Sequence, residues 1–337
     1  MKIALVQNSV VPAQRYGGTE RVIEWLARGL SELGHEIVMI AAAGSHNAYG
    51  ELIVPKDFHR WESEVPASVD VLHLWSPPGP NIPKPFLSTI GGNGKPGERF
   101  HPNTVFVSKQ HAAHHGSHHF VHNGLDPKDY TFSPDKKPEA VFLAKAAWNV
   151  KNLKGTIEVA RAAKVPLTVM GSRNWPLNSQ RLRPALGGVK YLGMVDDETK
   201  RAVLPRARAL LFPVRWHEPF GIAVTEALVS GCCVLGTPYG SLPEIVTPEV
   251  GFLSTQAESL AQMLRKCIED PKTFSPEACR ARVINGGFTH LDMARSYIRY
   301  YERLLAQGNL GFSPEQAEPA SGDPITQALS TELLPWN

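Results

Sequence analysis

Short apolar segments alternate with amphipathic segments along most of this chain, and no other feature restricts its fold as strongly. Lys2–Gln7 and His35–Ala42 are apolar runs of strand length, and Thr19–Leu33 between them carries apolar residues at helical spacing. Further strands of the same kind are expected over Val69–Leu74, Phe86–Ile90 and Thr104–Val107. Because parallel neighbours in a sheet need a helix-length connection, this alternation predicts a doubly wound parallel sheet.

A stretch rich in Asp, Lys and Pro interrupts the alternation at residues 126–138, as a linker between domains would. The alternation then resumes. The expected strands are Ala140–Ala144, Pro166–Gly171, Val189–Leu192, Ala209–Phe212 and Cys233–Gly236, and the expected helices include Asn152–Ala163, Ala257–Glu269, Pro276–Ile284 and Leu291–Ala306. A chain of 337 residues is also long for one core. The sequence therefore predicts an α/β fold with two doubly wound domains, over residues 1–130 and 138–288, and a loose polar tail over residues 309–337.

The composition excludes several classes of protein. A net charge of +3 gives no support for a general nucleic-acid binder. The longest apolar run, near residues 37–43, is too short to span a bilayer. Four cysteines (Cys232, Cys233, Cys267 and Cys279) lack the spacing of a metal site and are expected to be buried thiols. A cytoplasmic protein is expected, with at most peripheral contact at the inner face of the membrane.

The segment Trp216–Glu226 carries most of the functional information. It follows an apolar run closed by proline, which indicates a buried parallel strand, and it continues into a helix over Ile222–Val229. Gly221 lies at the turn, so free backbone N–H groups at the helix start face the carboxyl end of the sheet, where open α/β folds bind ligands and stabilise anions. Glu218 and Glu226 lie on either side of this turn. Such a site suits a ligand with phosphates in its middle and hydroxyl groups at both ends, and a nucleotide sugar is one.

Five segments of the chain carry a family resemblance: Tyr16–Glu20, Val121–Asp126, Phe142–Lys151, Glu218–Glu226 and Gly240–Val246. In this order they resemble the glycine loop, the pre-linker segment, the basic segment, the paired-glutamate motif and its companion in the retaining glycosyltransferases with the GT-B fold. This is glycosyltransferase family 4, which includes many bacterial mannosyl-, glucosyl- and galactosyltransferases. The resemblance covers residues 2–305, and five motifs in the family's order are specific where one would be weak. It implies two Rossmann-like domains that face a central cleft, the acceptor side in the first and the nucleotide-sugar side in the second. It also implies that a C-terminal helix over residues 290–306 packs back on the first domain.

By this resemblance, the donor is held from both domains. Gly17 and Gly18 let the diphosphate or the sugar approach the backbone closely. Glu226 binds the ribose hydroxyls and Glu218 lies near the hydroxyls of the donor sugar, since a carboxylate accepts two hydroxyl bonds at once. The backbone groups that then face the sugar or the phosphate are those of Phe220, Gly221 and Ile222.

Two lysines are expected to neutralise the donor diphosphate. Lys145 stands where the family usually has arginine, and its spacing to Lys151 is one residue longer than usual. Lysine lacks the bidentate fork of arginine, so the first contact is expected to be weaker or shifted. Alignment back from the following helix favours Lys151 over Lys154 as the second cation.

Gly91 is the departure from the family pattern that matters most. The family commonly has a histidine here, at the end of the strand Phe86–Ile90, and that histidine helps to hold the donor sugar. His73, at the end of the strand Val69–Leu74, either reaches the site in its place or belongs to the core.

A metal-independent reaction without a cofactor is expected. His111, His114, His115 and His118 have a helical spacing that would suit zinc. Gly116 interrupts that helix, however, and no cysteine or carboxylate joins the set, so a solvated or packed histidine face is favoured. The sequence also contains no D-x-D pair.

The function expected from the resemblance is transfer of a sugar from a UDP- or GDP-sugar to an acceptor hydroxyl, with retention at the anomeric carbon. Glu218, Lys151 and Lys145 are the expected catalytic residues. The acceptor would be a saccharide, a lipid-linked molecule or a small molecule, and the context would be synthesis of a bacterial cell-envelope polysaccharide or glycolipid. Two alternatives remain open, a sugar-nucleotide epimerase and a non-catalytic protein that binds nucleotide sugars.

Overall fold

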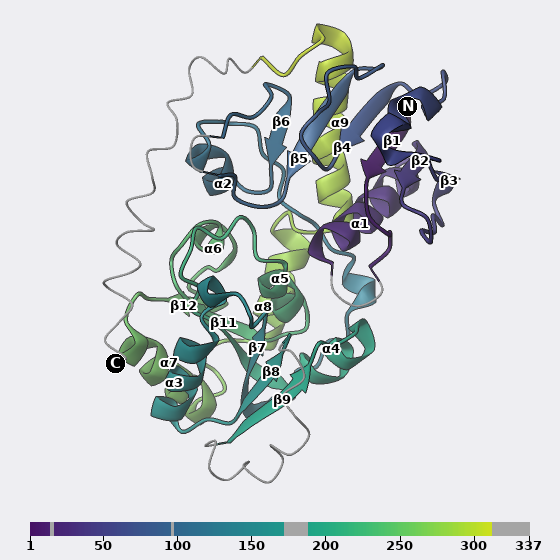
Figure 1. Cartoon of the computed structure of the whole chain (residues 1–337). Coiled ribbons are helices and arrows are strands. Elements are labelled where there is room, and N and C mark those ends of the chain that lie inside the picture. The colour runs from purple at the N-terminus through teal and green to yellow at the C-terminus, as the bar shows by residue number, and fades with distance from the viewer. Residues whose placement is uncertain (14–16, 96–97, 172–187, 312–337) are drawn as a thin grey trace. The chain divides into compact units, whose positions relative to one another are not determined.

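The computed structural model of the protein describes residues 1–13, 17–95, 98–171 and 188–311, and the chain divides into two compact units (Figure 1). The first unit holds Met1–Asp126 and the described chain from Gly287 onward, and the second holds Pro127–Gly286. Each unit contains a six-stranded sheet in which every neighbouring pair is parallel. The predicted α/β fold with two doubly wound parallel sheets is confirmed.

The sheet of the first unit has the strand order β3-β2-β1-β4-β5-β6. Its strands are β1 (Lys2–Gln7), β2 (Glu36–Ala41), β3 (Gly50–Ile53), β4 (Val71–Leu74), β5 (Phe86–Ile90) and β6 (Thr104–Phe106). The helices that accompany it are α1 (Gly18–Glu32), the 3-10 helix η1 (Phe58–Glu64), α2 (Lys109–His114) and α9 (His290–Gln307). The inner residues of β1, β2 and β4 are buried, as in a sheet covered on both faces.

Helix α9 packs against α1 and beside β5 (Figure 1). Its buried residues recur at helical spacing and include Met293, Tyr297, Tyr301 and Leu304. At Gly29 of α1, a Cβ atom would lie 2.6 Å from the carbonyl oxygen of His290, so the two helices approach as closely as they do because this residue has no side chain. This contact joins the C-terminal helix to the core of the first unit.

The second sheet repeats the order of the first, β12-β11-β10-β7-β8-β9. Its strands are β7 (Lys137–Leu143), β8 (Leu167–Met170), β9 (Val189–Gly193), β10 (Ala207–Phe212), β11 (Cys233–Gly236) and β12 (Gly251–Leu253). The helices are α3 (Leu153–Ala163), α4 (Asp197–Val203), α5 (Ile222–Val229), α6 (Leu242–Ile245), α7 (Ala257–Glu269) and α8 (Pro276–Asn285), with short 3-10 helices η2 (Pro127–Asp129) and η3 (Asn149–Lys151). The strand order reverses between β1 and β4 in one sheet and between β7 and β10 in the other. Open α/β sheets bind ligands beyond the carboxyl ends of the strands at such a point.

Three sequence-based expectations need correction. Strands β3 and β12 were not predicted, because each begins with glycine and has few buried residues, so neither contains the apolar run of a buried strand. Strand β7 begins at Lys137, where the polar composition indicated linker. The tail is not loose from residue 309 onward, since Leu310 is fully buried and its N–H donates to Asn103 Oδ1 at 3.1 Å. The rest of that predicted tail, residues 312–337, lies outside the described residues.

Two expectations from composition can be compared with the structure. Among the helices of the described residues, none has the length and apolar character needed to cross a bilayer. The four cysteines are free and buried, as predicted. Burial raises the pKa of the Cys232 thiol to about 12, which makes it a packing group rather than a nucleophile at neutral pH.

Candidate functional site

The loops after β7 and β10, on either side of the reversal in the second sheet, carry Lys145, Lys151 and Glu218. The two loops are joined through their backbones, because the N–H of Arg215 donates to the carbonyl oxygen of Val150 at 2.7 Å. Three of the sequence-predicted residues therefore lie where an open α/β sheet binds ligands.

Glu218 is a buried carboxylate held by two donors. Its Oε2 atom accepts from Lys151 Nζ at 2.6 Å and from Trp216 Nε1 at 2.6 Å. Lys151 is also buried, whereas Lys154 lies exposed in the first turn of α3. The attraction within a buried ion pair offsets the cost of desolvation when the charges are close and additional hydrogen bonds are made, and Trp216 supplies such a bond here. The structure thus brings Lys151 to the Glu218 carboxylate, while Lys154 lies exposed on α3.

The turn from Glu218 to Gly221 is fixed by the segment that follows β11. Ser241 donates its backbone N–H to the carbonyl oxygen of Glu218 at 3.0 Å and its hydroxyl to that of Phe220 at 2.6 Å. Gly240 has a φ of +62°, and a Cβ atom there would lie 2.1 Å from the Glu218 carbonyl oxygen. This close packing explains physically why the Gly240–Val246 segment accompanies the paired glutamates.

Helix α5 begins directly after this turn. Gly221 at its N-cap has a φ of +82°, in the left-handed region that glycine adopts without strain. No described side chain caps this helix start. The N–H groups of Ile222 and Ala223 therefore remain suited to hydrogen bonding with an anion or a sugar oxygen, whereas that of Val224 donates to the carbonyl oxygen of Gly221 at 2.8 Å.

Glu226 lies in the second turn of α5 and is buried among partners that sequence reasoning missed. Its Oε1 atom accepts from the Tyr130 hydroxyl at 2.9 Å and from Lys200 Nζ at 2.5 Å. Lys200 also pairs with Asp197 at 2.8 Å. Tyr130 follows the interdomain connection, and Lys200 lies in α4, whose first five residues include four charged ones. Neither residue carries a local signal, so only the fold reveals their contact with Glu226.

Lys145 occupies the start of the loop after β7. Its Nζ atom lies 4.7 Å from the ring centroid of Trp148, at a cation–π distance. Trp148 in turn contacts the Trp216 ring, with centroids 6.1 Å apart. The indole ring of Trp216 therefore links the surroundings of Lys145 to Glu218.

The first unit brings two predicted positions together at the carboxyl edge of its sheet. Helix α1 begins at Gly18, and a Cβ atom on Gly17 would lie 2.7 Å from Ala13 Cβ, so a side chain is excluded there. Gly91 follows β5, and the nearest atom to a Cβ at this position is Thr19 Oγ1, 3.8 Å away. Position 91 thus faces the first turn of α1 and has room for a side chain. Tyr16 of the glycine loop lies outside the described residues.

His73 belongs to the core of the first unit, which decides between the two interpretations of this residue. Its Nδ1 atom is 2.8 Å from the Tyr301 hydroxyl and its Nε2 atom is 2.7 Å from Thr89 Oγ1. Burial lowers the pKa of His73 to about 3, so the ring is neutral at physiological pH. With both nitrogens occupied inside the core, His73 does not substitute for the histidine that is absent at Gly91.

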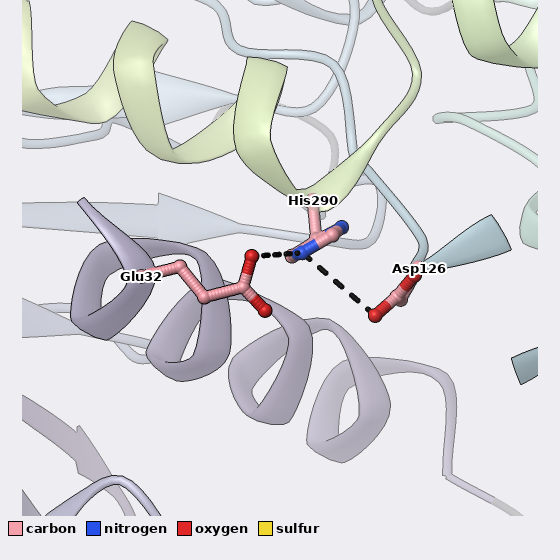
Figure 2. A group of neighbouring side chains, drawn as sticks. All are labelled: Glu32, Asp126 and His290. Atoms are coloured by element: carbon pink, nitrogen blue, oxygen red, sulfur yellow. Dashed lines mark hydrogen bonds and ion pairs between the residues drawn. The ribbon is translucent and has the colours of Figure 1, made fainter. Parts of the chain in front are cut away.

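One group of side chains in the described chain has metal-ligand spacing, and it also lies in the first unit. Figure 2 shows Glu32 of α1, His290 at the start of α9, and Asp126 with their polar atoms turned toward one another. His290 Nε2 is 3.3 Å from Glu32 Oε2 and 3.8 Å from Asp126 Oδ2. Asp126 Oδ2 also accepts from Arg28 Nη1 at 2.8 Å. Because a guanidinium already occupies the same carboxylate oxygen, the group fits an ion-pair network better than a cation site.

The histidine-rich segment behaves as a packed aromatic face. Helix α2 ends at His114, before Gly116. Within the described residues, the four histidines of this segment do not form a metal-ligand group. Phe106 contacts the rings of His111 and His115, each with centroids 5.0 Å apart. Packing of rings thus explains this segment.

Comparison with known proteins agrees with this geometry. Residues 128–285, nearly the whole second unit, match the model of the family described as glycosyl transferases group 1. The second unit is therefore similar to this family over nearly its whole length. Two curated relatives match at 31% and 27% identity, and the chain spans only about a third of their length, 32% and 27%.

Longer matches extend over both units. A phosphatidyl-myo-inositol mannosyltransferase of Mycolicibacterium smegmatis is 21% identical over 87% of this chain and 92% of its own. AviGT4, a glycosyltransferase involved in avilamycin A biosynthesis, is 26% identical, with a TM-score of 0.74 over 91% of this chain and 98% of its own. The Anabaena protein Alr3699/HepE, solved in complex with UDP-glucose, is 15% identical, with a TM-score of 0.64 over 91% of this chain and 100% of its own. The last similarity shows a shared fold.

Proposed function

We propose that the protein is a retaining, metal-independent glycosyltransferase that moves a sugar from a UDP- or GDP-sugar to an acceptor hydroxyl. The observation that carries this proposal is the buried Lys151–Glu218 pair directly before the uncapped start of α5. A cation, a carboxylate and free N–H groups are the groups that a sugar joined to a diphosphate requires. The family match of the second unit supports the same reaction class.

Glu226 is assigned to the nucleotide end of the donor. Tyr130 and Lys200 both bond to its Oε1 atom and thereby hold the carboxylate in one orientation. A fixed carboxylate binds a vicinal diol at a smaller entropic cost than a mobile one. We therefore assign the ribose 2′- and 3′-hydroxyls to Glu226.

Glu218 is assigned to the sugar end. Lys151 and Trp216 both donate hydrogen bonds to its Oε2 atom. Sugar hydroxyls would therefore be accepted at Oε1, while Lys151 compensates the charge. A group that binds only the sugar leaves the affinity for the nucleoside diphosphate unchanged and acts on turnover.

The reaction needs stabilisation of negative charge as the glycosidic bond loosens. Lys145, Lys151 and the N–H groups at the start of α5 supply it. The leaving phosphate oxygen takes the acceptor proton on the same face of the sugar. No protein base is then required, so the glycine at position 91 is compatible with activity.

The acceptor is proposed to be a hydroxyl of a lipid-linked or saccharide molecule of the bacterial cell envelope. The relative named a phosphatidyl-myo-inositol mannosyltransferase supports a lipid-linked acceptor. UDP is the first nucleotide to test, because the Anabaena neighbour holds UDP-glucose. A cytoplasmic location, with at most peripheral contact with the membrane, is part of the same proposal.

The test begins with a thermal-shift screen against UDP-, GDP-, ADP- and dTDP-sugars, in which a bound donor raises the apparent stability. Calorimetry then compares Glu226→Gln with Glu218→Gln for the selected nucleoside diphosphate. We expect Glu226→Gln to weaken binding by about 10- to 100-fold through lost charge-assisted hydrogen bonds. Glu218→Gln is expected to leave this affinity nearly intact, because glutamine keeps an acceptor oxygen for Lys151, and to depress turnover of the sugar donor. Equal affinities in both variants and the wild type would contradict the assignment of Glu226.

The two alternative functions predict different products. A sugar-nucleotide epimerase would convert the donor to a second UDP-linked sugar without any acceptor. A binding protein without activity would bind the donor and leave it intact in the presence of every acceptor. Nuclear magnetic resonance of the donor with and without acceptor separates these outcomes.

A further inference from the structure

Two lysines of the proposed donor site each lie against an indole ring. Lys145 Nζ is 4.7 Å from the ring centroid of Trp148, and Lys151 Nζ is 4.5 Å from that of Trp216. Both distances are within the range of a cation–π attraction. The two indoles meet edge to face, with centroids 6.1 Å apart and an interplanar angle of 76°.

The backbone between these residues is closely hydrogen-bonded. The N–H of Trp148 donates to the carbonyl oxygen of Lys145, and the N–H of Lys151 to that of Trp148, each at 2.9 Å. The N–H of Ala146 donates to the carbonyl oxygen of Gly171 at 3.0 Å, which ties the loop to the end of β8. The spacing of the two lysines along the loop is therefore set by the backbone, and the rings restrict their side chains.

Trp148 is unusual in its exposure. It is 42% exposed, although tryptophan is buried on average, and it lies just after the carboxyl end of a strand next to the reversal of the sheet. Packing in the core does not account for an indole in this position. The ring of Trp148 instead contacts the ammonium of Lys145 and the indole of Trp216.

We propose that Trp148 and Trp216 are positioning residues that hold Lys145 and Lys151 for the diphosphate of the donor; this inference rests on the proposed function. A lysine side chain carries about 2 kcal/mol of rotamer entropy and lacks the rigid fork of arginine. Each ring holds its ammonium at a cation–π distance, and Lys151 Nζ is oriented further by its hydrogen bond to Glu218 Oε2 at 2.6 Å. The two rings thus supply the preorganisation that arginine provides through its own planar group.

The inference is tested by calorimetry with UDP and uridine, or GDP and guanosine if the screen selects guanine. We expect Trp148→Leu to weaken binding of the diphosphate by roughly 3- to 30-fold, the strength of a cation–π contact. Affinity for the nucleoside should stay unchanged, because it lacks phosphates. Trp148→Phe should retain most of the affinity, since it keeps an aromatic face. Ile284→Ala is the matched control, because Ile284 of α8 is similarly exposed at 41% and should leave both affinities as in the wild type.

The Lys145→Met background separates positioning from a general structural effect. If Trp148 acts through Lys145, Trp148→Leu should have almost no further effect once the lysine is gone. An equal loss of diphosphate affinity in both backgrounds, or an equal loss for the nucleoside, would overturn the inference and leave the proposed function standing. A wild-type protein that binds no nucleoside diphosphate would overturn both.

Discussion

Replacing Lys200 by methionine should destabilise the second unit by about 3–5 kcal/mol, because it leaves the Glu226 carboxylate buried without its cation. Lys200 Nζ is 2.5 Å from Glu226 Oε1, and the two side chains are only 5% and 6% exposed. At an effective dielectric constant of about 20, unit charges this close attract by roughly 7 kcal/mol, and desolvation of both charges offsets much of that. The Tyr130 hydroxyl remains as a neutral donor and compensates the lost charge only in part.

Urea denaturation of the variants measures this cost directly. The double variant Lys200→Met/Glu226→Gln should recover much of the loss, since it removes the buried charge, so the two single effects should not add. Lys190→Met on the exposed side of β9 is the control and should change the free energy of unfolding by less than about 0.5 kcal/mol. A loss below about 1 kcal/mol for Lys200→Met, or additive effects in the double variant, would refute the claim that this pair holds the carboxylate.

Three further predictions concern the first unit. Burial lowers the pKa of His73 to about 3, so below pH 6.5 the unfolded chain binds a proton that the native state does not. The free energy of unfolding should therefore fall as the pH decreases, by about 2 kcal/mol at pH 5. Urea titrations should show that His73→Gln removes this part of the pH dependence. Gly91→His should fold normally, because a Cβ atom there meets nothing closer than 3.8 Å, and should raise kcat for the donor; a clash-induced loss of stability or an unchanged kcat would contradict the placement of this position at the site. A chain ending at Gly308 should be about 1.5–3 kcal/mol less stable than one ending at Gly311, because it lacks the buried side chain of Leu310, a difference that melting curves would detect.

Helices and strands with a clear apolar or amphipathic pattern were predictable from the sequence, including the residues at which they begin and end. Strands β1, β5 and β11 and helices α5 and α7 have the predicted bounds, because each is a continuous apolar or amphipathic segment closed by a polar residue, glycine or proline. Strands β3 and β12 lie at sheet edges and are held by one neighbour each. Each begins with glycine and has few buried residues, so no apolar run marks it in the sequence.

The candidate site was predictable only as far as its motifs reach. Sequence order placed Lys145, Lys151 and Glu218 after strands, and the parallel topology then required them to share one edge of the sheet. The partners of Glu226 come from the interdomain connection and from a charged helix, so their approach depends on the packing of distant segments. The role of His73 was ambiguous because all four residues of β4 are buried, so the strand has no alternation that shows which side chains face α9.

The most direct test of the proposed function is the anomeric configuration of the sugar after its transfer from the donor to an acceptor alcohol. The donor selected by the thermal-shift screen would be incubated with the protein and a simple alcohol, and the anomeric proton of the new glycoside followed by nuclear magnetic resonance. We predict a glycoside with the anomeric configuration of the donor, formed together with the nucleoside diphosphate and formed more slowly with Glu218→Gln. A glycoside of the opposite configuration, an epimerised nucleotide sugar or an unchanged donor would contradict the proposal of a retaining glycosyltransferase.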